Sequence, residues 1–476
     1  MNETKHTSDD ALSATNGDIN RLGSGKIGRL LWEYSIPAVV GMLVMSLYNV
    51  IDRIFIGQGV GPEAIAGLAI TFPVMNISAA IGVLIGAGSS ARVSILLGAR
   101  DRHGAEITLG NSLVLIIVNA CVYLTLMRIY LDDILIAFGA SPASLPYAHD
   151  FMAWILPGML IMNIGFSLNN VMRASGYPIK AMKAMFIGAG CNLLLAPIFI
   201  FALDMGIKGA AIATDISMGI FTVYVLMHFI NRKNTLHFRR GCWKLQRKTV
   251  WNIIGIGAAP SLVNLASCFI NIIINTNLYE YGGDNAVAAA GIFTTFTSLL
   301  CMAVVGMCQG MQPIVGYNYG AGNLHRLKRA YFLTVGWGTA VVAAGTAIGI
   351  FCPQLIARLF TADAMLIHTT SRALSMAMMC FFVVGFQIVS TNFFQSIGKI
   401  PQSIFLSLTR QVIFLIPLLL LLSDRLGLDG IWLSFPLSDA LATIVTFIMI
   451  AWEFHKIDRS LRKSDYNTKR HCHSAI

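Results

Sequence analysis

The stretch NRKNTLHFRRGCWKLQRKT at residues 231–249 carries seven Lys or Arg residues and separates two long apolar halves of the chain. It is the only long charged connection, and it lies almost at the midpoint. The whole chain is 56% hydrophobic and only 12% charged, with a mean hydropathy of +0.69. A soluble protein of this length needs roughly twice that charge to cover its surface. We therefore expect lipid to surround most of the chain, with residues 231–249 as a linker between two halves.

Six apolar segments precede this linker and six follow it. A membrane-spanning helix needs about 20 mainly apolar residues, because its backbone amides must be bonded within the segment where water is absent. The pattern predicts an all-α membrane protein with twelve transmembrane helices in two pseudo-symmetric six-helix lobes. The expected spans are 30–57, 62–97, 107–130, 147–172, 180–203, 208–230, 250–279, 285–316, 329–351, 367–395, 400–422 and 430–453.

The remaining segments are polar and complete the domain plan. Residues 1–25 lack the apolar core of a signal peptide, so we expect a disordered cytosolic tail there. An N-lobe at 26–230 and a C-lobe at 250–453 flank the linker, and a basic cytosolic tail follows at 454–476.

The basic residues are distributed by topology. Of the 34 Lys and Arg residues, 26 lie on one set of connections and 5 on the opposite set; Arg53, Arg92 and Arg410 fall inside spans. Cytoplasmic loops of membrane proteins carry the excess of Lys and Arg. The bias predicts a multi-pass protein of a bacterial inner membrane with both termini in the cytoplasm, and it explains the net charge of +11 without a nucleic-acid partner.

The two halves resemble each other at an offset of about 222 residues. Repeats of six helices share one topology, so their symmetry axis runs along the membrane normal, and such a pair can rock around a central cavity. The matching pairs are Pro37 with Pro260, AIAGLAI at 64–70 with AVAAAGI at 286–292, LLGARDRH at 96–103 with NYGAGNLH at 318–325, RASGYPIKAM at 173–182 with QSIGKIPQSI at 395–404, and GIKGAAIA at 206–213 with GLDGIWLS at 427–434.

Motifs of enzymes and ATP-driven pumps are missing. The segment LGSGKIG at 22–28 lacks the first glycine and the Ser or Thr of a phosphate-binding loop. The nine cysteines form neither a disulfide framework nor a metal-binding spacing, and no HExxH motif occurs. We expect no enzyme activity and no cofactor, and transport that an ion gradient drives or that is passive.

Polar residues inside spans of the first half are candidate sites, because an ionisable group in lipid costs at least about 2.5 kcal/mol. Asp52 lies deep in the first span, with Asn49 on the same helical face. Its carboxylate is expected to exchange a proton or cation; the alternatives are an ion pair with a neighbouring arginine or a place near the interface. If the helices surround one cavity, Asn192, Thr214 and Asp215 complete an oxygen-rich pocket with Asp52. Otherwise Asp215 lies at the cytosolic or lipid edge.

The second half offers amides instead. Asn264, Asn271 and Asn275 form one stripe on the seventh span. Gln387, Thr391 and Gln395 form another on the tenth span. Each stripe lines a wet substrate cavity or holds helices together.

Several motifs together resemble the multidrug and toxic compound extrusion (MATE) transporters over residues 25–450. They are YSIPAVVGMLVMSLYNVIDRIFIGQGVG at 34–61, FP at 72–73, SILLGARD at 94–101, RASGYP at 173–178, NLLLAPIFIF at 192–201 and GIKGAAIATDIS at 206–217. The resemblance implies a V-shaped pair of lobes and export of cationic or amphiphilic compounds in exchange for H⁺ or Na⁺. It also implies that Asp52, Asn192 and Thr214 form the proton or Na⁺ site. We expect a monomer in contact with membrane lipid.

The sequence departs from the family pattern at two places. Many relatives have an acidic residue before the fifth-span proline, where this chain has Ala196; our hypothesis is that Asp215 replaces that carboxylate. The acidic pair of some relatives in the C-lobe is also missing, and Asn275 with Gln387 or Asn392 are the nearest polar residues. A C-lobe Na⁺ site is therefore not expected.

Three other functions remain as alternatives. A flippase for lipid-linked precursors or polysaccharides, from the same superfamily, needs a strongly cationic central cavity, and only Arg53, Arg92 and Arg410 are available for it. An intramembrane enzyme needs clustered catalytic side chains, and the spans contain none. A channel usually forms its pore by oligomerisation, and its flux would not depend on an ion gradient.

Overall fold

The computed structural model describes residues 19–59, 62–138 and 144–474, with side chains described except at 49, 53, 57–69 and 460–474. Every regular element in these ranges is helical. The expected N-terminal tail lies mostly outside the described residues. Its last part is ordered against the protein, since Ile19 and Leu22 are buried.

The N-lobe consists of six long helices that confirm the first six expected spans within a few residues. A short helix, α5 (Leu131–Ala137), which the sequence analysis missed, follows the third. The long helices are α2 (Ile27–Gly59), α3 (Pro62–Gly98), α4 (Arg102–Ile129), α6 (Leu145–Ala174), α7 (Pro178–Pro197) with the π-helical turn η1 (Ile198–Ala202), and α8 (Gly206–Ile230).

The C-lobe repeats this order with more interruptions. Helix α9 (Arg247–Gly320) contains two spans that meet at Gly283, whose φ of 62° breaks the helical path. The other elements are α10 (Leu324–Phe351), the short α11 (Pro353–Phe360), α12 (Ala364–Ala377), η2 (Phe381–Val383), α13 (Val384–Ser396), α14 (Ile400–Leu408), η3 (Thr409–Leu415), α15 (Ile416–Leu426) and α16 (Leu428–Ser474).

The described residues confirm twelve spans. Ten helices are long and apolar enough to cross a membrane, and α9 is one of them although it holds two spans. The bent pair Ala364–Ala377 and Phe381–Ser396, with 56° between its parts, supplies the tenth span. Helix α16 continues past the expected end of the last span into the segment predicted as a tail.

The repeat is visible in the irregular elements as well as in the spans. The short helices α5 and α11 begin at 131 and 353, which is the offset of 222 residues found in the sequence. The π-helical turns η1 and η3 lie in the fifth helix of each lobe, near Pro197 and Pro417. A proline removes a backbone donor, and π-helical turns are one way for a helix to absorb the irregularity.

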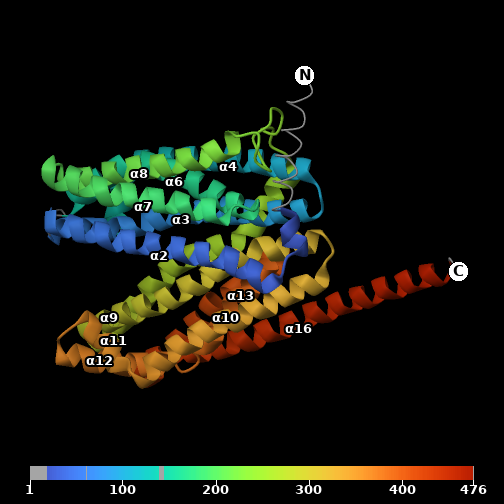
Figure 1. Ribbon diagram of the computed structural model, residues 1–476. Helices are drawn as coiled ribbons and strands as arrows, with labels where there is room; N and C mark the ends of the chain where they lie inside the picture. Colours follow the sequence, from blue (N-terminus) through green and yellow to red (C-terminus); the bar gives the residue numbers. More distant parts are fainter. Residues whose placement is uncertain (1–18, 60–61, 139–143, 475–476) are drawn as a thin grey trace.

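The two lobes meet at one end of the molecule and diverge toward the other, as Figure 1 shows for α2 and α9. We call the end that carries residues 231–246 the linker end and the opposite one the far end. Near the linker end, α3 crosses α9 with the backbones in contact. A Cβ added to Gly88 would overlap the carbonyl of Ile253, and one added to Gly257 would overlap the carbonyl of Leu84.

Polar contacts reinforce this crossing. Ser90 Oγ donates to Gln312 Oε1 at 3.2 Å, and these residues are 222 positions apart, so they occupy equivalent places in the two repeats. The buried Arg173 of α6 donates to Gln309 Oε1 of α9 and, at 3.2 Å, to Asn169 Oδ1. The seam between the lobes is therefore tight and partly polar at the linker end.

Candidate functional site

Asn192 and Thr214 form the centre of a polar cluster inside the N-lobe. Asn192 Nδ2 on α7 donates to Thr214 Oγ1 on α8 at 3.0 Å, and both side chains are buried. The bond joins two neighbouring helices one turn before Pro197 and η1. A buried amide needs such a partner, because an unpaired polar group in an apolar environment costs about 1–3 kcal/mol. The structure thus brings these two expected site residues together.

Tyr48 on α2 connects this pair to the carboxylates, and the sequence analysis missed it. Its phenol bonds to Thr214 and interacts electrostatically with Asp52 and Asp215. The signal was present in the sequence, because Tyr48 precedes Asp52 by four residues and so lies on the same helical face. A tyrosine within an apolar helix simply resembles a packing residue.

Asp215 points into the lobe. Its carboxylate lies against Gly158 on α6, where an added Cβ would overlap both the carboxyl carbon and Oδ1. Because Gly158 has no side chain, α6 leaves room there for the carboxylate of Asp215. Of the two positions that the sequence left open, the structure supports the lobe interior, beside Tyr48 and Thr214, over the cytosolic or lipid edge.

Asp52 is partly buried on α2 and lies near Tyr48. The side chain of Asn49, expected on the same face, lies outside the described residues, as does that of Arg53. The cluster within the N-lobe thus combines two carboxylates, a phenol, an amide and a hydroxyl. Such oxygen donors suit a proton or a hard cation such as Na⁺, and they do not suit a metal that prefers thiolate or imidazole.

A cavity of about 190 Å³ opens between α2 and α7 beside this cluster. Tyr48 and Asn192 are its polar lining residues. A dry cavity of about 150 Å³ holds a benzene molecule, so the space fits one aromatic ring or a short alkyl group. The apolar lining residues are Val44, Leu47, Ile51, Phe186, Ala189, Gly190 and Leu193.

The polar residues expected in the second half fall into two groups. Asn271 and Asn275 are exposed on α9, as is Asn264, so the whole stripe faces outward. Asn392 bonds to the carbonyl of Ile388 in its own helix, and Thr391 is half-buried. An exposed amide stripe on a spanning helix is compatible with a wet cavity.

Gln387, expected among the substrate residues, is buried inside the C-lobe and bonds to a neighbouring helix. Its Nε2 donates to the Asp439 carbonyl at 2.7 Å and to Thr443 Oγ1 at 2.6 Å, so it connects α13 with α16. The sequence left two roles open for this stripe, which were to line a wet cavity or to hold helices together. These bonds give Gln387 the second role.

Beside Gln387 lies an ion pair that the sequence analysis did not identify. Arg410 Nε, in η3, donates to Asp439 Oδ1 at 2.6 Å, and the two side chains are 25% and 2% exposed. The sequence places Arg410 inside a span, but no spacing rule connects it with Asp439, which lies 29 residues away on a different helix. The pair occupies the fifth and sixth helices of its lobe, as Asn192 and Thr214 do in theirs.

Comparison with known proteins gives a consistent result. The MatE family model matches residues 37–198 and again 260–421, which is the internal repeat. The multidrug export protein MepA of Staphylococcus aureus is 23% identical over 424 residues, covering 89% of this chain and 93% of that protein. A FAD transporter of Shewanella oneidensis is 27% identical over 441 residues, covering 91% and 96%.

Solved structures agree with the fold. A MATE transporter in a bent conformation superposes with a TM-score of 0.88 at 26% identity, covering 93% of this chain and 98% of that one. A MOP superfamily transporter from Pyrococcus furiosus gives a TM-score of 0.86, also at 26% identity, covering 92% of this chain and 97% of its own. With both halves matched and the two-lobe architecture shared, this chain belongs to the MatE family of multi-pass membrane transporters.

Proposed function

We propose that this transporter exports small amphiphilic or cationic compounds by alternating access, in exchange for H⁺ or Na⁺ that enters the N-lobe cluster. The observation that carries the proposal is the convergence of Tyr48, Asn192, Thr214 and Asp215, with Asp52 close to Tyr48, inside one lobe. Among the described residues, no Lys, Arg or His forms an ion pair with Asp215. A carboxylate without a fixed cation is stable in such a place only when a proton or a mobile cation neutralises it.

In this proposal Asp215 supplies the carboxylate that Ala196 lacks. Ala196 is fully buried on α7, one turn after Asn192. Asp215 approaches the same region from α8, next to Thr214. Its contact with Gly158 supports this role, because the space for the carboxylate exists only where α6 has no side chain.

Ion binding must act on the seam between the lobes to drive transport. A ligand shifts a conformational equilibrium only if it binds one state more strongly. The lobes contact each other near the linker end and diverge toward the far end. With the linker end in the cytoplasm, as the basic residues indicate, this is the outward-open state, and the inward-open state requires the crossing of α3 with α9 to separate.

A transport assay with purified protein in liposomes tests the proposal. Ethidium efflux is measured with an H⁺ gradient and a Na⁺ gradient collapsed separately, for the wild type and for Asp52→Asn. We expect efflux to depend on one gradient and to fall at least about tenfold in the variant. Efflux by Asp52→Asn at the wild-type rate, with unchanged dependence on the gradient, would refute the coupling site.

A second candidate substrate is a flavin nucleotide, because one relative is named a FAD transporter. A dinucleotide is anionic, and it would need basic side chains in its path. The same liposomes loaded with FAD separate the candidates. FAD efflux without ethidium efflux would favour the anionic substrate.

A further inference from the structure

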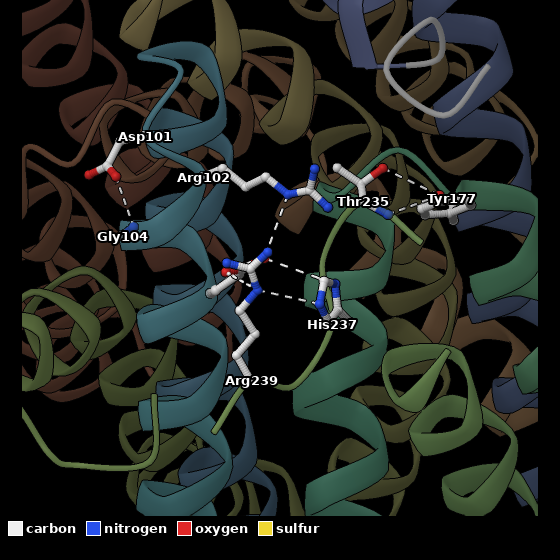
Figure 2. Close-up of polar contacts among 8 residues, drawn as sticks. Asp101, Arg102, Gly104, Tyr177, Thr235, His237 and Arg239 are labelled. Atoms are coloured by element: carbon white, nitrogen blue, oxygen red, sulfur yellow. Dashed lines mark hydrogen bonds and ion pairs between the residues drawn. The ribbon is translucent and has the colours of Figure 1, made fainter. Parts of the chain in front are cut away.

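The linker is held rigidly on the N-lobe. Glu106 on α4 is 1% exposed and forms ion pairs with Arg102 at 3.6 Å and with Arg239 of the linker at 3.2 Å. Figure 2 shows Arg239 lying between Arg102 and His237, with Thr235 bonded to Tyr177 nearby. A buried carboxylate with two guanidinium partners fixes the first half of the linker in one position.

Asn111 fixes the second half. This side chain is fully buried on α4, and its Nδ2 donates to the carbonyls of Cys242 and Lys244 at 3.2 and 3.1 Å. Its Oδ1 accepts from the backbone N–H of Gln246 at 2.8 Å. A single amide thus satisfies three backbone groups. With Cys242 buried below, the side chains from 243 to 248 project outward.

The outward side chains are of two kinds. Trp243 and Leu245 are 41% and 44% exposed, and Trp243 stacks on Phe238 with 5.2 Å between ring centroids. Around them are four exposed cations, and none of the four forms an ion pair within the described part of the chain: Arg240, Lys244, Arg247 and Lys248. They differ in this from Arg102 and Arg239, which both form an ion pair with the Glu106 carboxylate.

The neighbouring surface indicates what these side chains meet. Ile230, the last residue of α8, is 67% exposed, and Trp251, in the first turns of α9, is 64% exposed. In a multi-pass protein, such an exposed apolar belt contacts lipid, and tryptophan is enriched where the apolar core ends at the headgroups. The linker segment continues this belt and adds positive charge to it.

We propose that Arg240 and residues 243–248 form a binding site for the phosphate groups of anionic phospholipids. Trp243 and Leu245 insert at the boundary of the acyl chains, while the four cations meet the headgroups. Basic residues near an anionic surface attract it within about one Debye length, and the attraction weakens with salt. Because Glu106 and Asn111 hold the linker in place, the site is preorganised and anchors the N-lobe at this level of the membrane.

Fluorescence quenching by brominated lipids tests the site in reconstituted full-length protein. The signal of Trp243 is the difference between the wild type and Trp243→Phe. We expect brominated phosphatidylglycerol to quench Trp243 about three- to tenfold more effectively than brominated phosphatidylcholine at low salt. That preference should fade near 0.5 M salt, roughly where screening is strong.

Charge variants separate a specific site from a general attraction. The triple variant Lys244→Gln, Arg247→Gln, Lys248→Gln should lose the preference for phosphatidylglycerol. The matched control removes three exposed arginines at the far end: Arg128→Gln, Arg358→Gln and Arg425→Gln. It should keep the preference.

Three results would overturn the proposal. They are equal quenching of wild-type Trp243 by both lipids, an equal loss of preference in the control variant, and no quenching by either lipid combined with Lys244-dependent binding of a soluble polyanion. The last would assign the surface to an acidic macromolecule instead.

Discussion

The two lobes place polar clusters on equivalent helices but neutralise them differently. In the N-lobe, Asp215 lies beside Tyr48 and Thr214 with no ion pair to a described basic residue. In the C-lobe, Asp439 is bound by Arg410 at 2.6 Å. A guanidinium cannot leave its helix or release its proton at ordinary pH. The C-lobe carboxylate thus has a permanent cation, whereas in our proposal a mobile ion neutralises the N-lobe carboxylate.

This difference indicates that the two lobes, although related by an internal repeat, have different roles. Asp52 has Asn275 as its equivalent in the second half, at the offset that aligns Pro37 with Pro260. The seventh span therefore lacks a carboxylate equivalent to Asp52, and the C-lobe carboxylate of Asp439 is paired with Arg410. We expect ion exchange in the N-lobe and a structural role for the C-lobe pair, and five predictions follow from the comparison.

The largest expected effect is on stability in the C-lobe. Arg410→Met leaves the buried Asp439 without its cation, which should lower the free energy of unfolding by about 3–5 kcal/mol. The double variant Arg410→Met, Asp439→Leu should recover most of the loss, because it removes both charges. Thermal unfolding of the detergent-solubilised protein measures both. A double variant as unstable as the single one would mean that the pair does more than neutralise itself.

The N-lobe should respond in the opposite way. Asp215→Asn removes a carboxylate that has no fixed cation, so unfolding should change by less than about 1 kcal/mol. Gradient-driven efflux should fall at least about tenfold, because the amide cannot take up a proton or balance a cation. Stability and efflux measured on the same preparation decide this. If the variant loses stability but pumps normally, Asp215 is a structural residue like Asp439.

Separation of the lobes should depend on the close crossing of α3 with α9 at Gly88 and Gly257. Gly88→Ala places a Cβ against the carbonyl of Ile253, so we expect it to weaken the closed linker end and to favour the inward-open state. Labelling of a single cysteine placed at Ser90, in a background without other cysteines, should become several-fold faster. Gly219→Ala is the control, since a Cβ there meets no atom within 4 Å. Equal labelling in both would show that the crossing does not gate the seam.

Tyr48→Phe tests whether the phenol connects the Asn192–Thr214 pair to the two carboxylates of the N-lobe cluster. Loss of one buried hydrogen bond costs about 1 kcal/mol, which corresponds to roughly a fivefold change in an equilibrium. We expect efflux to fall by about that factor and its dependence on the driving ion to shift. Ethidium efflux at several external ion concentrations measures both. Tyr224→Phe, half-buried on α8, is the matched control.

The smallest effect concerns the linker and pH. Burial lowers the pKa of His237 below its usual value, against the opposing influence of Glu106. Its Nε2 accepts from Arg239 Nε at 3.4 Å, so protonation also removes a bond. A lowered folded-state pKa gives stability that is present above the ordinary pKa near 6.5 and lost as pH falls below it. Protease cleavage at 231–246 should therefore increase slightly below about pH 6, and His237→Gln should remove that pH dependence.

The sequence predicted the spans well because the length and apolar character of a membrane helix follow directly from the solvent. It predicted the repeat because the glycines and prolines of both halves keep their spacing. The short helices α5 and α11 were missed, since seven or eight residues carry no spanning signal. The break inside helix α9 was expected between the spans 250–279 and 285–316, and the backbone locates it at Gly283.

The candidate site was predicted in part. Asn192, Thr214 and Asp215 were found because polar residues are conspicuous in apolar helices. Tyr48 was not, because an aromatic residue there looks like packing. The bond of Arg410 to Asp439 joins two different helices, and only their packing sets that distance.

Gradient-driven ethidium efflux from liposomes, compared between two double variants, tests the central claim most directly. Asp52→Asn with Asp215→Asn removes both carboxyl groups of the N-lobe cluster, and Arg410→Met with Asp439→Leu removes the C-lobe ion pair. We predict that the first variant loses coupled efflux and that the second retains most of it. Coupled efflux that survives in the first and disappears in the second would place ion exchange in the C-lobe and contradict this account.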